Sequence, residues 1–196
     1  MAILQGEKIY QKYVKRILDL VIGILILLLF WWLLVVIALI ILFTDGNPIL
    51  FGQERIGLYG KPFRIYKFRT MVKNAEQIGA RSTADKDPRI TPIGRFLRKT
   101  SLDELAQVFN VIKGDMSFVG YRPGVRENYT EEDYKSGIFN VKPGITGYAQ
   151  INGRSSLEVE DARRWELKYV EDISFATDVK VLFKTVAVVL KRSGTN

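Results

Sequence analysis

The sequence predicts an α+β, mostly helical fold, in which an N-terminal membrane-embedded helix joins a small domain with short strands and amphipathic interface helices. Three observations predict it. Residues 17–43 form an apolar run with a single charge, Asp19. Short apolar segments separated by glycine and proline turns follow this run. Later segments then repeat their apolar residues at helical spacing. The predicted domains are therefore residues 1–44 and 45–196.

The apolar run is long enough for a bilayer. At about 1.5 Å of rise per residue, an unbroken helix over its 27 residues would be roughly 40 Å long. The hydrocarbon layer is roughly 30 Å thick. The run is too long for a cleaved signal peptide, and no small-residue cleavage site follows it. The chain is therefore expected to lie in or on a membrane.

The topology of the run stays open on the residues alone. Positive residues mark the cytoplasmic side of a membrane, and here they flank both ends of the run. One crossing would send one cluster across, whereas a re-entrant helix would keep both on one face. Bends usually need a proline, and Gly23 is the only weak point. The flanking residues are Lys8, Lys12, Lys15 and Arg16 before the run, and Arg55, Lys61, Arg64, Lys67 and Arg69 after it.

The rest of the chain divides into short elements. A turn is expected at 44–48, strands at 49–53 and 62–69, and a polar loop with one short helix at 73–92. Helical spacing predicts helices at 93–99, 101–112 and 157–170, and a C-terminal helix in partial contact with the membrane. Ser101 and Glu104 match a capping box at the start of the second of these helices, and Gly114 should end it.

Composition excludes several kinds of chemistry. The chain has no cysteine, which excludes disulfides, thiolate nucleophiles and cysteine metal sites. It has no histidine, so the commonest general base and zinc ligand is absent. Catalysis would have to use carboxylates, lysine, tyrosine, hydroxyl groups or a metal held by oxygen atoms.

The net charge of +8 is unevenly distributed along the chain. Residues 45–100 carry twelve basic and five acidic side chains, whereas residues 101–196 carry thirteen and fourteen. This basic segment fits a surface attracted to anionic lipid, a site for phosphate-rich ligands, or both. Nucleic acid is not an expected partner, because a bilayer is already the obvious anionic one.

Asp103 and Glu104 are the strongest candidates for chemistry, and two interpretations apply to them. Acids in the first turn of a helix complement its dipole, and Glu104 can close the capping box. On the pattern alone this structural role is the commoner one. Alternatively, adjacent carboxylates can hold a hard cation such as Mg²⁺, or one of them can act as a nucleophile.

Basic residues supply candidate phosphate ligands, although most exposed arginines are only solvated surface. The glycine-containing segment 142–154, KPGITGYAQINGR, is a weak phosphate-loop signal, since it matches neither of the common glycine-rich motifs. The basic residues that we consider for a diphosphate are Lys67, Arg69, Arg89, Arg95, Arg98 and Arg122.

Several long motifs together resemble one known family. They are FGQERIGLYGKPFRIYKFRTM (51–71), TPIGRFLRKTSLDELAQVFNVIKGDMSFVGYRP (91–123), KPGITGYAQINGR (142–154) and the tail YVEDISFATDVKVLFKTVAVVLKRSG. In this order behind a hydrophobic helix, they resemble the bacterial sugar transferase family, the monotopic phosphoglycosyl transferases, in its minimal catalytic-domain form. The resemblance covers nearly the whole chain.

The resemblance implies an enzyme at the cytoplasmic face of the bacterial inner membrane, with 45–196 as its cytoplasmic catalytic domain. Family members transfer a phospho-sugar from a UDP-sugar to a polyprenol phosphate, usually undecaprenyl phosphate, and release UMP at the start of glycan assembly. They depend on Mg²⁺ and form a covalent aspartyl-phosphosugar. The resemblance places the nucleophile on Asp103 and Mg²⁺ on Asp103 and Glu104. The implied phosphate ligands are Lys67, Arg98, Arg122 and Arg154.

Two departures from the family pattern matter. A Pro-Arg-Pro motif is common where this chain has Tyr121-Arg122-Pro123, so we expect a local backbone change with the arginine retained. The family's membrane helix usually carries a Ser-Pro break where this chain has Phe30-Trp31-Trp32. We still favour the re-entrant topology, with a weak bend near the tryptophans. The alternative function is a membrane-anchored, non-catalytic scaffold that binds anionic partners.

Overall fold

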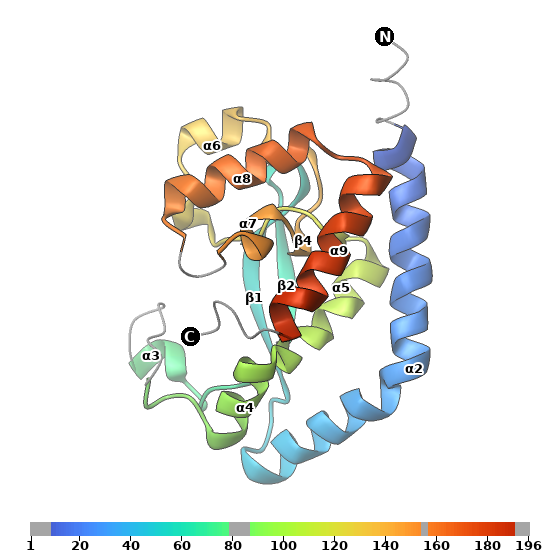
Figure 1. Ribbon diagram of the computed structural model, residues 1–196. Coiled ribbons are helices and arrows are strands. Elements are labelled where there is room, and N and C mark those ends of the chain that lie inside the picture. Colours follow the sequence, from blue (N-terminus) through green and yellow to red (C-terminus); the bar gives the residue numbers. More distant parts are fainter. Residues whose placement is uncertain (1–8, 79–86, 154–156, 191–196) are drawn as a thin grey trace.

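The computed structural model describes residues 9–78, 87–153 and 157–190 (Figure 1). A long N-terminal helix runs along one side and the base of a body made mainly of helices with two small sheets. This arrangement confirms the predicted α+β, mostly helical fold.

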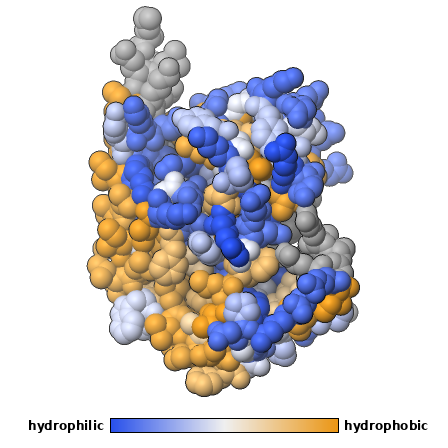
Figure 2. All heavy atoms as spheres, turned by 180° about the vertical axis from the view of Figure 1, so that it is seen from behind, coloured by the Kyte–Doolittle hydropathy of each residue, from blue (hydrophilic) through white to orange (hydrophobic). Residues whose placement is uncertain are grey.

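Helix α2 (Lys15–Thr44) is the membrane element, and one π-helical turn, η1 (Tyr10–Val14), leads into it. Within the described residues, Tyr10–Thr44 is the one helix long and apolar enough to cross a membrane. Only 11% of its most apolar window is buried inside the protein. The apolar side chains form a broad surface on the back of the molecule (Figure 2). Exposure of that apolar surface to water would be strongly unfavourable, whereas the hydrocarbon layer of a bilayer would accommodate it.

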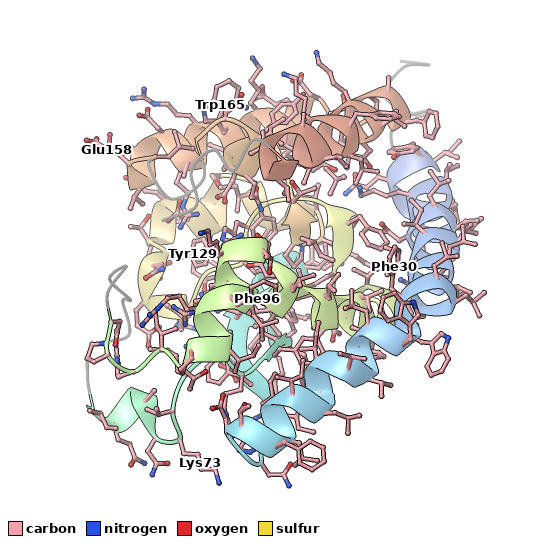
Figure 3. All side chains as sticks on the ribbon, turned by 60° about the horizontal axis from the view of Figure 1, so that its bottom comes forward. Phe30, Lys73, Phe96, Tyr129, Glu158 and Trp165 are labelled. Atoms are coloured by element: carbon pink, nitrogen blue, oxygen red, sulfur yellow. The ribbon has the colours of Figure 1, made fainter. Side chains whose placement is uncertain are left out.

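Helix α2 bends near its middle (Figure 1), close to Phe30, which is labelled in Figure 3. Both halves pack on the same body. In the first half, the Asp19 carboxylate accepts hydrogen bonds of 3.0 Å from the Ser117 hydroxyl and the Phe118 backbone N–H. In the second half, Ile37 and Ile41 are buried in a cluster that includes residues of strand β2 and helix α4. The body therefore fills the inner angle of the bent helix.

Strands β1 (Leu50–Ile56) and β2 (Pro62–Phe68) form an antiparallel hairpin, close to the predicted ranges. The 3₁₀ turn η2 (Leu58–Gly60) joins them. Asn110 holds the hairpin to helix α5 (Val108–Lys113) through both ends of its amide. Its Oδ1 accepts from the Tyr66 N–H at 3.0 Å, and its Nδ2 donates to the Arg64 carbonyl at 2.7 Å. These hydrogen bonds fix the position of the hairpin, and of the side chains that it carries, relative to α5.

The segment after helix α4 (Pro92–Thr100) differs from the prediction. Ser101 adopts a left-handed conformation with φ of 57° and makes no side-chain cap, so the predicted capping box is wrong. A 3₁₀ helix, η3 (Leu102–Gln107), replaces the expected first turns, and α5 follows it. Gly114 ends α5 at φ of 99°, as predicted. The physical reason for the 3₁₀ turn lies in the partners of Glu104, described below.

The described part of the glycine-containing segment, residues 142–153, mainly builds secondary structure. It contributes strand β4 (Gly144–Thr146), which pairs in parallel with β3 (Ser117–Val119), and helix α7 (Tyr148–Ile151). A Cβ atom at Gly144 would lie 2.1 Å from the Gly120 nitrogen, so only glycine permits this close approach. The pairing of β3 with β4 and this close approach place Gly144 beside the residues that follow β3.

The remaining elements close the body around a core that includes Met116, Tyr121 and Tyr169. Helix α9 (Phe175–Leu190) is tied to the start of α2, because Asp178 pairs with Lys15 and accepts a hydrogen bond from Tyr10 at 2.6 Å. Its membrane contact stays a prediction. The other elements are α3 (Ala75–Ile78), η4 (Arg126–Asn128), α6 (Glu131–Lys135), η5 (Ile138–Asn140) and α8 (Val159–Glu171).

Candidate active site

Glu104 joins three separate parts of the fold. Its Oε1 atom accepts from Lys67 Nζ on β2 at 2.7 Å and from the Arg122 guanidinium, which follows β3, at 3.1 Å. Its side chain therefore points away from the backbone N–H that a capping box would use. The 3₁₀ geometry of η3 and the left-handed Ser101 present Glu104 to these partners, which replaces local capping with long-range ion pairs.

The two adjacent carboxylates have opposite electrostatic environments. Burial raises the pKa of Asp103 to about 6, because the charges of Lys67 and Arg98 only partly offset it. Burial alone would also raise the pKa of Glu104. There the charges and hydrogen bonds of Arg122 and Lys67 outweigh burial and hold the pKa at about 2. Glu104 is therefore a permanent anion at neutral pH, while Asp103 is an anion held at a free-energy cost.

Asp103 is the carboxylate left open for chemistry. It is only 9% exposed, and among the described residues no side chain donates a hydrogen bond to it. Arg98 on α4 is close enough to lower its pKa, and the Arg98 Nε donates to the Thr70 hydroxyl at 2.8 Å. This second contact fixes the guanidinium near Asp103. An unpaired, buried carboxylate beside fixed cations is suited to act on an anionic substrate.

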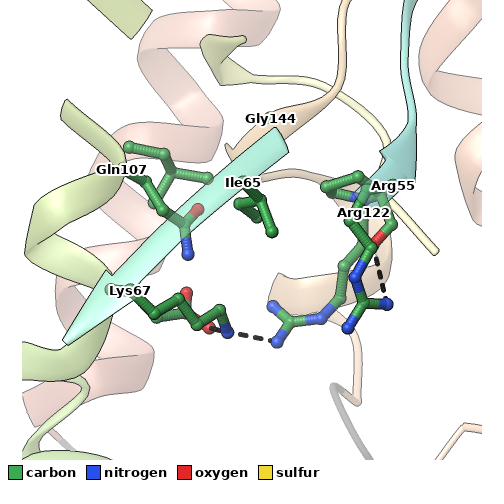
Figure 4. A pocket seen from close by; sticks show the side chains of 9 residues that line it. Arg55, Ile65, Lys67, Gln107, Arg122 and Gly144 are labelled. Atoms are coloured by element: carbon green, nitrogen blue, oxygen red, sulfur yellow. Dashed lines mark hydrogen bonds and ion pairs between the residues drawn. The ribbon is translucent and has the colours of Figure 1, made fainter. Parts of the chain in front are cut away.

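A small polar pocket opens beside this pair (Figure 4). Cations from β1, β2 and the loop after β3 meet there, while Asp103, next to Glu104 in η3, is not among the lining residues. The pocket is suited to an anionic ligand that approaches Asp103 from one side. The residues that line it are Arg55, Ile65, Lys67, Glu104, Gln107, Arg122, Pro123, Gly144 and Ile145.

The structure brings together Lys67, Arg98 and Arg122 of the predicted phosphate ligands, whereas the other three contact different groups or face solvent. Arg69 donates to the carbonyls of Asp45 and Gly46 at the end of α2, both at 2.7 Å. Arg89 pairs with Asp87, and Arg95 is exposed on α4. Arg154, a predicted substrate-binding residue, lies outside the described residues.

Arg55 is a pocket residue that the sequence analysis considered only as a positive flank of the membrane helix. The pairing register of β1 and β2 would have identified Arg55 as a pocket residue. In the antiparallel hairpin, Gln53 faces Ile65, Arg55 faces Phe63 and Phe51 faces Lys67. Residues two apart share a face, so Arg55 and Lys67 lie on the same face of the hairpin. The alternation of side chains along β1 and β2 contains this information. It becomes usable only when the pairing register of the two strands is known, and the sequence alone did not fix that register.

Buried groups hold the backbone of Arg122 and of the residues next to it in the loop after β3. The Glu166 carboxylate on α8, 3% exposed, accepts the Arg122 backbone N–H at 3.1 Å. The Tyr129 hydroxyl accepts from the Gly124 N–H at 2.8 Å. Tyr121, which stands where the family often has proline, is fully buried and donates to the Ile56 carbonyl at 3.0 Å. The tyrosine thus anchors the loop to β1, and Arg122 still reaches the pocket.

A divalent cation is compatible with the carboxylate pair. The described residues contain no cluster of three or more histidine, cysteine or acidic side chains. Mg²⁺ is commonly held by one or two carboxylates together with substrate phosphates, so a larger cluster is not required. Asp103 and the Oε2 atom of Glu104 make none of the ion pairs described above. These oxygen atoms fit a site that a phosphate ligand would complete.

Comparison with known proteins shows similarity over most of the chain. The bacterial sugar transferase family model matches residues 10–192. The chain is 40% identical to the undecaprenyl-phosphate galactose phosphotransferase of Salmonella typhimurium, over 93% of this chain and 42% of that protein. It is 42% identical to the UDP-glucose:undecaprenyl-phosphate glucose-1-phosphate transferase of Escherichia coli, over 89% of this chain and 40% of that protein.

A third relative has nearly the same length as this chain. The uncharacterized sugar transferase EpsL of Bacillus subtilis is 40% identical over 92% of this chain and 89% of EpsL. The chain thus spans about two fifths of the first two relatives and most of the third. The family match covers the membrane helix, the hairpin and the carboxylate pair alike. The chain therefore belongs to the bacterial sugar transferase family.

Proposed function

We propose that this protein transfers a phospho-sugar from a UDP-sugar to a polyprenol phosphate and releases UMP. One observation carries the proposal. Lys67 and Arg122 converge on Glu104 beside the open carboxylate of Asp103. The names of the Salmonella and Escherichia coli relatives give undecaprenyl phosphate as a substrate of those proteins, and the second also gives a UDP-sugar. The site has the charges that such substrates require.

The proposed reaction has two steps at one phosphorus atom. An Asp103 carboxylate oxygen attacks the sugar-bearing phosphorus, the P–O bond to the nucleotide breaks, and UMP leaves with the bonding electrons. A phosphate oxygen of the polyprenol phosphate then attacks the same phosphorus and releases the Asp103 carboxylate. Phosphoryl transfer depends mainly on positioning and on charge neutralisation, which this site supplies without histidine or cysteine.

The residues around Asp103 have distinct proposed roles. Lys67, Arg98 and Arg122 bind and orient phosphate oxygens, and Glu104 keeps Lys67 and Arg122 in place. Asp103 and Glu104 would hold Mg²⁺, which when bound neutralises charge on those oxygens. The raised pKa of Asp103 marks a carboxylate that its surroundings stabilise poorly, and such a group is a better nucleophile than a solvated one.

We also propose that α2 is re-entrant and that the body lies at the cytoplasmic face. Both halves of α2 contact one body, which supports a helix that enters and leaves by the same face. Around the bend, Leu28, Leu29 and Trp31 are each more than 60% exposed, as expected for the most deeply inserted part. A crossing helix would instead carry one half away from the body. A site beside the bilayer lets a water-soluble donor meet a lipid acceptor.

Some of the basic residues that flank α2 bind the protein itself. Lys15 is buried in an ion pair with Asp178. Arg16 donates to the carbonyls of Val111 and Ile112, at 2.6 and 2.7 Å, and so caps the end of α5. Two of the flanking cations therefore have tertiary roles, and contact of both halves of α2 with the body is the stronger support.

UMP release tests the proposed function. We expect purified protein with Mg²⁺, a polyprenol phosphate and a suitable member of a UDP-sugar panel to release UMP. Asp103→Asn should abolish release, whereas Asp161→Asn, a control on the exposed surface of α8, should not change it. No release with any UDP-sugar, together with anion binding that weakens steeply with salt, would support the scaffold alternative. Full activity of a folded Asp103→Asn variant would contradict the nucleophile assignment.

A further inference from the structure

The pocket beside Glu104 carries more positive charge than its own carboxylate neutralises. Arg55, Lys67 and Arg122 line it together with one acidic residue. Glu104 accepts from Lys67 and Arg122, and among the described residues no carboxylate pairs with Arg55. An excess of positive charge in a pocket of a phosphate-transferring site predicts an anionic ligand with more than one charge.

Arg55 donates fewer hydrogen bonds within the protein than its guanidinium group can make. One terminal nitrogen donates to the Gln53 side-chain oxygen at 2.5 Å, and the other lies 3.5 Å from the Pro123 carbonyl, at the limit for a hydrogen bond. Its Nε atom is buried and has no partner. An arginine presents five N–H donors, so this side chain retains unused donors in the pocket wall.

The neighbours of Arg55 place it at the far end of the site from Asp103. Lys67, Glu104, Arg98 and Arg122 are charges that act on Asp103. Arg122 and Glu104 are the charged side chains that act on Arg55, and burial together with Arg122 lowers the pKa of Arg55. Figure 4 shows the same order, with Arg122 between Lys67 and Arg55. Two guanidinium groups that repel each other in one pocket are expected to share an anion.

We propose that Arg55 binds the phosphate of the departing nucleoside monophosphate. A diphosphate whose sugar-bearing phosphorus lies near Asp103 would extend its second phosphate toward Arg122 and Arg55. When the P–O bond between the two phosphates breaks, the bonding electrons stay on the nucleotide oxygen, and Arg55 stabilises that charge. This inference rests on the proposed function and adds a residue and a step to it.

A purely structural role for Arg55 predicts different behaviour. In that case the Pro123 contact would hold the loop that carries Arg122, and removing Arg55 would displace a residue needed in both half-reactions. A leaving-group role affects only the half-reaction that forms or uses UMP. The two half-reactions can be followed separately, because donor and acceptor are added in turn.

The experiment compares full-length wild-type protein with Arg55→Gln, Arg55→Lys and the control Arg64→Gln. Arg64 is exposed on the facing strand of the same hairpin and does not line the pocket, so it matches the lost charge. The first reading is the rapid release of UMP from UDP-sugar and Mg²⁺ without acceptor. The second is transfer from the preformed intermediate to polyprenol phosphate. The third is UMP binding by calorimetry.

We expect Arg55→Gln to slow UMP release and to weaken UMP binding by about 10- to 100-fold, the range for a lost charge-assisted hydrogen bond. Transfer to the acceptor should stay within about twofold of wild type. Arg55→Lys should be intermediate, since it keeps the charge but not the planar fork. Arg64→Gln should match wild type in all three readings.

Unchanged UMP release in Arg55→Gln, or an equal loss in both half-reactions, would overturn the inference. If the wild-type protein released no UMP, the proposed function would fail by itself. UMP binding would then still decide on Arg55, because binding needs no chemistry. Equal UMP affinity of wild type and Arg55→Gln would overturn the assignment in that case as well.

Discussion

At the scale of single residues, the main feature is that neighbouring carboxylates differ in ionisation. Glu104 accepts hydrogen bonds from two cationic side chains and has a pKa of about 2, whereas Asp103 is buried and has a pKa of about 6. Carboxylates whose environments push their pKa values apart usually have separate roles. The sequence supplied the pair but not this division, because Lys67 and Arg122 come from distant segments.

A first prediction concerns stability. The pKa of Asp103 rises from 3.8 to about 6 on folding, so the folded protein holds this proton more tightly than the unfolded chain. Between those pH values stability falls as pH rises, by up to about 3 kcal/mol. Asp103→Asn should therefore raise the melting temperature at pH 7.5, and the gain should vanish near pH 4. Circular dichroism in detergent at both pH values measures this. A destabilised variant at pH 7.5 would contradict it.

A second prediction concerns Glu166 as a positioning residue for Arg122. Glu166→Ala leaves the part-buried Arg122 N–H without its acceptor, and we expect about a tenfold or larger loss in kcat/KM for the donor. Glu166→Gln should recover part of it, since an amide oxygen also accepts. Glu160→Ala, exposed on the same helix, is the control. If the alanine and glutamine variants lost activity equally, loss of the ion pair with Arg163 would be the better explanation.

At the scale of elements, helical periodicity predicted α4 and α8, and glycine and proline positions predicted the two strands of the hairpin and the end of α5 at Gly114. The prediction failed at the start of η3. The S-x-x-E pattern of Ser101 and Glu104 is the usual mark of a capped helix, and a left-handed serine is uncommon. Long-range ion pairs outweighed the local preference there. Departures of this kind, where tertiary contacts override local propensity, are expected at functional sites.

The bend of α2 leads to a third prediction. The Trp32 indole N–H donates to the Leu29 carbonyl at 3.0 Å, beside the bend, and in a bilayer no water would replace that donor. Spin labels on Val21→Cys and Leu39→Cys span 18 residues, or roughly 27 Å in a straight helix. We expect a shorter distance in wild type. Trp32→Phe should lengthen or broaden it, whereas Trp31→Phe should not. A wild-type distance equal to the straight value would contradict the bend in membranes.

At the scale of the whole molecule, the membrane helix also forms part of the wall of the domain. Gly23 packs against Ile112, and Asp19 binds the start of β3, so α2 and the helices that carry the site form one body. The sequence predicted a helix followed by a domain, with Asp19 as the single charge inside the apolar run and Lys15 as one of its flanking charges. Their real contacts, with residues about 100 and 160 positions away, could not be read from local pattern.

A fourth prediction tests the re-entrant topology. The chain has no cysteine, so Ile3→Cys provides a single site for a membrane-impermeant thiol reagent. A re-entrant α2 keeps this residue on the same face as the catalytic domain. Labelling should occur only after the cells are opened, as for a cysteine at Tyr59, an exposed residue of the hairpin turn. Labelling of Ile3→Cys in intact spheroplasts would mean that the helix crosses.

We propose above all that Asp103 carries the sugar phosphate between donor and acceptor. The most direct test of this role is the mass of the intact protein after incubation with Mg²⁺ and a UDP-sugar that it uses, without acceptor. We predict one added phospho-sugar per chain, located on Asp103 by peptide mapping, with one UMP released per chain, and no addition in Asp103→Asn. Turnover in the full reaction without any adduct, and with UMP released only when acceptor is present, would contradict a covalent role for Asp103.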